Sequence, residues 1–262
     1  MNKTKPVIEV KDLRLKLGNE WIHDGVNLSI EQGEIMGIVG KSGSGKTTLM
    51  REILMLQRPD SGSVKVFDHE LTTASADELK KIEHRWGVLF QQNALFSSLT
   101  LIENIEFPLR EFIRLPTDIR EALAMQKILS VGLGSEACNK YPAQLSGGMQ
   151  KRAGLARALA LDPEILFLDE PTAALDPDSA ADLDNLILDL QQALGLTVVV
   201  VTHDLDTLWK ITNRVAFLFE GKVLCVDSME NLVKNPHEVI QEFFNGPRGR
   251  TAEAIYGQNH GN

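Results

Sequence analysis

The chain has 262 residues, of which 43% are hydrophobic and 24% are charged, and its formal net charge is −9. This length and composition suit a globular protein with a sizeable core and exclude disorder over the whole chain. The acidic balance argues against non-specific binding to nucleic acid and against adsorption to an anionic membrane, because both need a positive field. No apolar run approaches the roughly 18 residues that span a bilayer, and the N-terminal segment lacks the pattern of a signal peptide. If the protein serves a membrane process, a partner is expected to supply the membrane part.

The first part of the chain has the pattern of strands. Hydrophobic and polar residues alternate from Val7 to Ile30 on both sides of Gly18-Asn19. This period of two around a turn dipeptide predicts antiparallel strands. Residues 34–39 are apolar and lead into glycines, which predicts a buried strand that feeds a loop. A helix is expected from Thr47 to Leu56.

The later part of the chain alternates between apolar runs and helical patterns. Ile165–Leu168 and Thr197–Val201 are dense apolar runs, typical of central parallel strands covered on both faces. Residues 99–161 between them and the first part are mostly helical in pattern. Strands separated by helices predict an α/β fold with a parallel sheet. Residues 246–262 have little apolar periodicity and are expected to form a loose tail.

A phosphate-binding motif follows the first buried strand. The pattern G-x-x-x-x-G-K-[ST] is matched by Gly40, Lys41, Ser42, Gly43, Ser44, Gly45, Lys46 and Thr47. Glycines let successive N–H groups point at phosphate oxygens, and the helix N-terminus adds its partial positive charge. Lys46 is expected to reach the β- and γ-phosphates of ATP, Thr47 to hold Mg²⁺, and Thr48 to join the nucleotide contacts. An ordinary Gly/Ser loop is the alternative, but the strand before and the helix after favour the phosphate loop.

Acidic and amide side chains follow three further apolar runs. Asp169 and Glu170 end the run that begins at Ile165, and carboxyl ends of parallel strands meet at one edge of a sheet. Asp169 is expected to bind Mg²⁺, and Glu170 to orient or deprotonate the attacking water. Gln91 is expected to coordinate Mg²⁺ or water, and His203 to sense the γ-phosphate. Each of these residues taken alone is more typical of an ordinary strand end or helix cap.

The segment Leu145–Gln150 reads LSGGMQ and precedes a predicted helix from Gln150 to Leu161. With the phosphate loop, Gln91, the acidic pair, Ala174-Leu175-Asp176 and His203 in this order, it resembles the ABC ATPase family over residues 7–246. The resemblance implies an ABC ATPase domain with a P-loop, RecA-like core. An antiparallel β subdomain and a helical subdomain of about residues 93–157 would be inserted in this core, and residues 247–262 would follow as a tail.

The resemblance also implies how ATP is held. Ser146, Gly147 and Gly148 start a helix and offer a second phosphate cradle, which in the family closes on the ATP of a partner subunit. A homodimer is therefore expected, with Asp176 at the dimer seam, where it would couple the two sites.

An adenine platform is the one family feature that the sequence does not supply. The family usually stacks an aromatic residue on the base near the first hairpin, but Leu15 and Leu17 stand there. Trp21 falls on the following strand and is expected in the core rather than under the base. Weak discrimination between ATP and GTP follows as a prediction.

Two segments resemble ATPases of the Mla and Mce type, which drive lipid movement across the bacterial envelope. The first comprises residues 92–96, 103–105 and 107–111, and the second is residues 242–250. The implied partners are a membrane permease, a periplasmic Mce-type lipid-binding protein and a small regulatory subunit, with no nucleic acid. The implied location is the cytoplasmic face of the bacterial inner membrane, where the permease holds the ATPase peripherally. An ABC ATPase for amino acids or metal ions, and a non-transport ABC protein of translation or DNA repair, remain alternatives.

Residues 93–115 are the expected surface for the permease. Some of their apolar side chains are expected to be exposed and to form a cleft that receives a permease helix, while others pack the helical subdomain. The residues concerned are Leu95, Phe96, Phe107, Pro108, Leu109 and Arg110.

Overall fold

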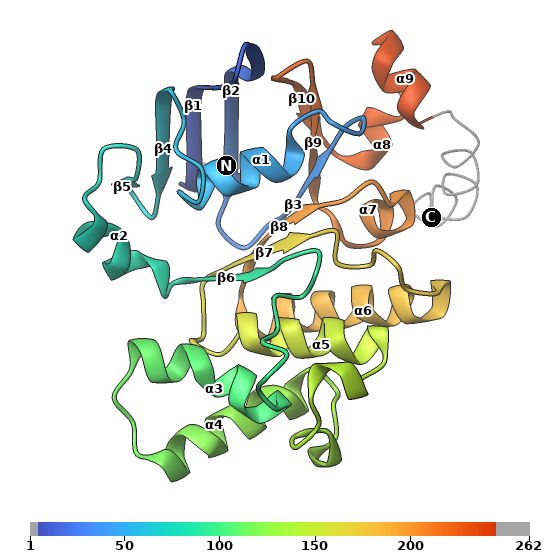
Figure 1. Cartoon of the computed structure of the whole chain (residues 1–262). Coiled ribbons are helices and arrows are strands. Elements are labelled where there is room, and N and C mark those ends of the chain that lie inside the picture. The colour runs from blue at the N-terminus through green and yellow to red at the C-terminus, as the bar shows by residue number, and fades with distance from the viewer. Residues whose placement is uncertain (1–4, 245–262) are drawn as a thin grey trace. The chain divides into compact units, whose positions relative to one another are not determined.

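The computed structural model describes residues 5–244 (Figure 1). The chain divides into two compact units, one made of residues 5–79 and 199–244 and the other of residues 80–198. The boundaries fall inside helix α2 (Ala76–Glu83) and strand β8 (Thr197–Val201). The predicted tail of residues 247–262, and the part of the second lipid-type segment beyond Phe244, lie outside the described residues.

An antiparallel sheet in the first unit confirms the antiparallel strands that the alternation of the first thirty residues predicted. Its order is β2-β1-β4-β5, and the turn at Gly18-Asn19 joins its first two strands. The apolar residues that alternate from Ile8 to Leu15 and from Val26 to Ile30 are buried, because period-two alternation puts every second side chain on one face. The strands are β1 (Pro6–Leu17), β2 (Glu20–Glu31), β4 (Ser61–Val66) and β5 (His69–Glu70).

A second group of strands in the first unit includes the predicted buried strand. β3 (Ile35–Val39) is buried at all five positions and pairs in parallel with β9 (Arg214–Phe219). β9 pairs in antiparallel fashion with β10 (Lys222–Asp227). Helix α1 (Lys46–Ile53) follows the loop after β3, close to the expected Thr47–Leu56.

Three short helices, α7 (Leu205–Ile211), α8 (Met229–Leu232) and α9 (Glu238–Phe244), pack on β9. Phe217 of β9 is fully buried at the centre of this cluster, and its ring centroid lies 6.1 Å from that of Phe244. The carboxyl end of the described chain is therefore held by an apolar core.

The second unit is mostly helical, as the pattern of residues 99–161 predicted. Helices α3 and α4 lie side by side (Figure 1), and β6 pairs in parallel with β7. The regular elements are β6 (Trp86–Leu89), α3 (Leu101–Phe112), α4 (Thr117–Ser130), α5 (Gly147–Ala158), β7 (Ile165–Asp169) and α6 (Pro177–Leu194). Two single-turn 3-10 helices span Ser135–Ala137 and Pro142–Gln144. Within residues 5–244, no helix is long and apolar enough to cross a bilayer.

One prediction of burial was wrong. Trp21 was expected in the core, but 51% of it is exposed. It stands directly after the turn at the end of the first hairpin, opposite Lys16, whose Nζ lies 5.5 Å from the indole centroid. Among the apolar residues of 93–115, which were expected to be partly exposed and partly packed, Leu109 is one of those that pack, since only 1% of it is exposed. It continues the buried stripe of Leu101 and Ile105, since residues four apart share one face of a helix.

Candidate functional site

The phosphate loop of the first unit runs from β3 to the start of α1, and two of its glycines are required by the backbone. A Cβ atom on Gly40 would lie 2.2 Å from the carbonyl oxygen of Leu218 on β9, so only glycine fits this close approach. Gly45 caps α1 with φ of 93°, a left-handed conformation that glycine adopts without strain. The strand–loop–helix context that the motif needs is therefore present.

Lys46 is already placed over the loop that precedes it. Its ammonium donates hydrogen bonds to the carbonyl oxygens of Gly40 at 2.9 Å and Lys41 at 3.1 Å. No acidic residue stands in the first turn of α1, so the positive end of this helix is not neutralised from within its own sequence. Thr47 and Thr48 follow in the same turn. This cradle of N–H groups and one ammonium fits a polyphosphate.

His203 comes from the strand beside the one that leads into the loop. The N–H of Thr202 donates to the carbonyl of Ile38 at 3.4 Å, so the end of β8 lies next to β3. His203 itself is exposed, and Asp204 after it caps α7 by accepting from the N–H of Asp206 at 3.0 Å. Within the first unit, the fold thus brings His203 and the phosphate loop to the ends of neighbouring strands.

In the second unit, a lysine that the sequence did not single out ties two of the predicted residues together. Lys151 of α5 is only 4% exposed, and its ammonium donates to the carbonyl oxygens of Gln91 at 2.8 Å and Glu170 at 3.2 Å. Glu170 has φ of 49°, a conformation uncommon outside glycine. The lysine therefore fixes the backbone at both predicted catalytic positions.

Two opposing effects act on the pKa of Lys151, and burial outweighs the nearby carboxylates. Burial lowers the pKa of Lys151, while the nearby carboxylates of Asp169 and Glu170 act in the opposite direction. Asp169, at the end of the fully buried β7, is 3% exposed. A signal for Lys151 was present in the sequence: it stands three residues after Gly148 and four before Leu155, on the buried face of its helix.

The LSGG segment starts its helix earlier than predicted. α5 begins at Gly147 rather than at Gln150, because Ser146 is its N-cap. The hydroxyl oxygen of Ser146 accepts a hydrogen bond from the N–H of Met149 at 3.3 Å. Both glycines therefore belong to the first turn, where their N–H groups have no partner inside the helix.

A second helix N-terminus stands beside this one. A Cβ atom on Gly148 would lie 3.9 Å from the hydroxyl of Ser179, in the first turn of α6. Asp176 caps α6 by accepting from the N–H of Ser179 at 2.9 Å. Hydrogen bonding from the Ser179 side chain, and then from its N–H, lowers the pKa of Asp176. The predicted cradle and the predicted seam residue thus share one surface of the second unit.

A cavity of about 190 Å³ lies between β6, α3 and α5 of the second unit. Pro108 and Phe112 of α3 line it, and Phe112 is 49% exposed. Arg157 lines it from α5, with its guanidinium carbon 4.6 Å from the ring centroid of Phe96. The buried Oδ1 of Asn93 has no hydrogen-bond partner among residues 5–244. The wall therefore combines apolar side chains with polar groups, among them the Arg157 cation, the Glu83 carboxyl group and the Asn93 acceptor, which could orient a partner.

The predicted site residues fall into two sets. The first unit holds the phosphate loop, Thr48 and His203. The second unit holds Gln91, Ser146, Gly147, Gly148, Asp169, Glu170 and Asp176. Within each unit the residues cluster at strand ends and helix N-termini, as phosphate chemistry requires.

Comparisons with known proteins agree with these motifs. A profile of the ABC transporter family matches residues 23–173, and one of an AAA domain matches residues 139–208. The probable ribonucleotide transport ATP-binding protein mkl of Mycobacterium leprae is 38% identical over 241 residues, which are 92% of this chain and 69% of the relative. The methionine import ATP-binding protein MetN of Brucella abortus is 38% identical over 237 residues, 90% of this chain and 64% of that protein.

Solved structures give the same result and confirm the α/β cassette fold. The dimeric, post-hydrolysis ATP-binding cassette MJ0796 bound to ADP and Pi is 35% identical, with a TM-score of 0.78 over 85% of this chain and 98% of that one. The protein cbiO1 from Clostridium perfringens, part of the transporter complex cbiONQ, is 25% identical, with a TM-score of 0.80 over 96% and 99%. The family profile covers more than half of the chain, and the mycobacterial relative is matched over more than two thirds of its length. The chain therefore belongs to the ABC transporter family, as an ATP-binding domain with ATPase activity.

Proposed function

We propose that this chain is the Mg-ATP-hydrolysing motor of a transporter that moves lipids across the bacterial envelope. The observation that carries the nucleotide chemistry is the phosphate loop, in which Lys46 lies over the carbonyls of Gly40 and Lys41 at a helix N-terminus with no acid in its first turn. The cassette MJ0796, which shares the fold, contains ADP and Pi.

Thr47 of α1 and the residues at strand ends carry the oxygen ligands that Mg²⁺ binding and hydrolysis need. Thr47, Gln91 and Asp169 offer hydroxyl, amide and carboxylate oxygens, the ligands that Mg²⁺ prefers. Bound there, Mg²⁺ would neutralise charge on the phosphates. Glu170 would accept the proton of the attacking water as the water oxygen bonds to the γ-phosphorus and the bond from that phosphorus to the β,γ-bridging oxygen breaks, so that ADP leaves and phosphate is formed. Lys151 holds the Glu170 carbonyl, so the position of this base is fixed by the helix that carries the LSGG motif.

A homodimer is the proposed working form. Ser146, Gly147 and Gly148 start α5 beside the start of α6, which is capped by Asp176. Two adjacent helix N-termini favour a bound anion, here the γ-phosphate of ATP held by a second copy of the chain. The dimeric structures of MJ0796 support this arrangement.

The proposed membrane partner is a permease, which would hold the motor at the cytoplasmic face of the inner membrane. The 190 Å³ cavity beside α3 offers Phe112, Pro108 and Arg157 to a helix of that partner. The lipid assignment is supported by the resemblance of residues 92–111 to Mla and Mce ATPases, whose periplasmic Mce-type protein and small regulatory subunit would be further partners. Amino-acid import is the second candidate, favoured by the 38% identity to MetN.

Two experiments test these proposals. Replacing Lys46 with alanine removes the ammonium at the phosphates, and we expect no measurable ATP binding in a titration; wild-type affinity would contradict the site. The transported class is tested by purifying the tagged chain with its membrane partner and reconstituting both in liposomes. ATP-dependent transfer of a labelled phospholipid supports the lipid assignment. ATP-dependent methionine uptake without lipid transfer would instead support the second candidate.

A further inference from the structure

A buried histidine–glutamate pair lies directly behind the phosphate loop of the first unit. His23 of β2 and Glu52 of α1 are both 0% exposed, and His23 Nδ1 is hydrogen-bonded to Glu52 Oε2. The second polar atom of each side chain, His23 Nε2 and Glu52 Oε1, has no hydrogen-bond partner among residues 5–244. An unpartnered buried polar atom destabilises a fold, so this pair is a poor choice for stability alone.

The surroundings of the pair show that apolar residues would serve the core better. The other inward residues of α1, Leu49, Met50 and Ile53, are apolar and fully buried. Replacing a buried ionisable pair with apolar residues of similar size is often neutral or stabilising. A role beyond packing is therefore needed to account for His23 and Glu52.

The unpartnered edge of the imidazole faces the loop. A Cβ atom on Gly45 would lie 2.6 Å from His23 Nε2 and 3.3 Å from its Cδ2. Gly45 is the N-cap of α1 and immediately precedes Lys46. The imidazole thus fills the space behind Gly45, the residue with left-handed backbone at which the loop ends and the helix begins.

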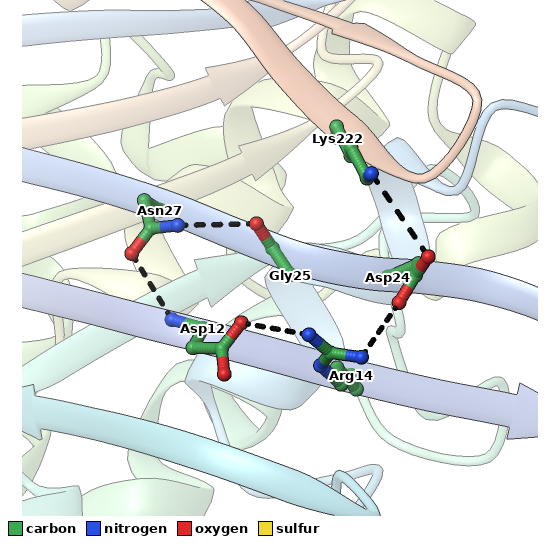
Figure 2. A network of polar contacts seen from close by, with 6 residues as sticks. All are labelled: Asp12, Arg14, Asp24, Gly25, Asn27 and Lys222. Atoms are coloured by element: carbon green, nitrogen blue, oxygen red, sulfur yellow. Dashed lines mark hydrogen bonds and ion pairs between the residues drawn. The ribbon is translucent and has the colours of Figure 1, made fainter.

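The strand that carries His23 is itself held in place (Figure 2). The N–H of Asp24 donates to the carbonyl of Gly221 at 2.9 Å, in the turn between β9 and β10. Figure 2 shows the Asp24 carboxylate between Arg14, at 3.0 Å, and Lys222, at 4.0 Å. Each exposed ion pair contributes little, but together with the backbone bond they fix the position of β2 at this point. The imidazole therefore has a rigid base from which to support the loop.

We propose that the His23–Glu52 pair is a positioning device for the phosphate loop. Glu52 fixes the imidazole through Nδ1, and the Nε2 edge holds Gly45, and with it Lys46 and the N-terminus of α1, in the phosphate-binding conformation. A loop that is already ordered loses less entropy when the anion binds, so affinity for polyphosphates rises. The inference rests on the nucleotide-binding function proposed above and adds a layer of residues that do not touch the nucleotide.

Three variants of the full chain separate positioning from packing. H23N keeps an amide nitrogen near the place of Nδ1, so it keeps the bond to Glu52 but loses the edge that faces Gly45. H23Q places its amide nitrogen near Nε2 and keeps that edge. The double variant H23L/E52L replaces the pair with apolar side chains and keeps the space filled.

The readouts are the Kd for ATP and for ADP, the KM and kcat of ATP hydrolysis, and the melting temperature without nucleotide. We expect H23N and H23L/E52L to weaken ATP and ADP binding about tenfold. This is the lower end of the loss in affinity seen when residues that support the direct ligands of a bound metal ion are replaced. KM should rise with Kd while kcat at saturating ATP stays within about twofold, because the residues of the second unit are unchanged. H23Q should stay within about threefold of wild type, and H23L/E52L should melt no lower than wild type.

Other results overturn the inference. Wild-type affinity in both H23N and H23L/E52L would show that the pair only packs the core, as would an affinity loss that follows a fall in melting temperature. If neither variant folds, the pair is structural and the proposal is wrong. Lys46→Ala separates this failure from failure of the proposed function. If wild type does not bind ATP, the function fails; if Lys46→Ala abolishes binding while H23N does not weaken it, only this inference fails.

Discussion

Replacing Lys151 with methionine tests whether the LSGG helix holds the catalytic strand ends. Lys151 is 4% exposed, and its ammonium donates to the carbonyls of Gln91 at 2.8 Å and Glu170 at 3.2 Å. Each hydrogen bond that involves a charged group contributes about 1.5–3 kcal/mol, and desolvation of the ammonium offsets part of the sum. We expect a net loss of about 2–3 kcal/mol in transition-state stabilisation, which lowers kcat roughly 30- to 150-fold.

The assay is phosphate release by the full chain over a range of ATP concentrations. KM for ATP should change less than about threefold, because the Lys151 ammonium is hydrogen-bonded to Gln91 and Glu170 of the second unit, whereas the phosphate loop belongs to the first. Lys127→Met is the matched control: Lys127 is 7% exposed and pairs with Asp162, away from the predicted site residues. It should change the melting temperature but leave kcat near wild type. A Lys151→Met enzyme with the kcat of the control, or with a KM effect larger than the kcat effect, would refute the reasoning.

Three further predictions concern the base, the adenine and the permease. Glu170→Gln keeps the shape but cannot accept a proton, so we expect ATP to stay bound without turnover and a closed dimer to accumulate in size-exclusion chromatography; wild-type turnover would remove Glu170 from this role. Because Trp21 is 51% exposed, it is available to stack on the base, and Trp21→Ala should raise the Kd for ATP by about tenfold, within the range of roughly 1–3 kcal/mol measured for stacking. An unchanged Kd would show that Trp21 does not stack on the base, and it would support the weak discrimination between ATP and GTP predicted from the sequence. Phe112→Ser and Arg110→Glu should weaken co-purification of the permease while the basal ATPase activity of the isolated chain survives; intact association in both variants would place the docking surface elsewhere.

Local sequence determined the elements that hold the nucleotide motifs. Ile35–Val39, Ile165–Asp169 and Thr197–Val201 are buried at every position, as their unbroken apolar runs predicted. The glycines of the phosphate loop and the turn at Gly18-Asn19 fixed where strands end, because few other residues adopt those backbone conformations. These features depend on residues near one another in the chain, so periodicity and glycine placement suffice to predict them.

Several functional features depended on contacts between distant residues. Lys151 meets carbonyls 60 and 19 positions away, and His23 meets Glu52 from 29 positions away. Periodicity could place Lys151 and His23 on inward faces, but it gave no sign of the partners that allow a charged or polar side chain to stay buried.

How much of an apolar side chain is exposed near the end of a helix or strand also depended on the tertiary structure. Trp21 is as apolar as its strand neighbours, yet it lies at the open end of a hairpin with Lys16 beside it. Leu109 and Phe112 are both apolar and lie on the same helix. Leu109 faces the core of the second unit, whereas Phe112 faces solvent and the cavity. A sequence pattern specifies which face of an element is apolar, whereas the packing of the other elements decides how much of that face they cover.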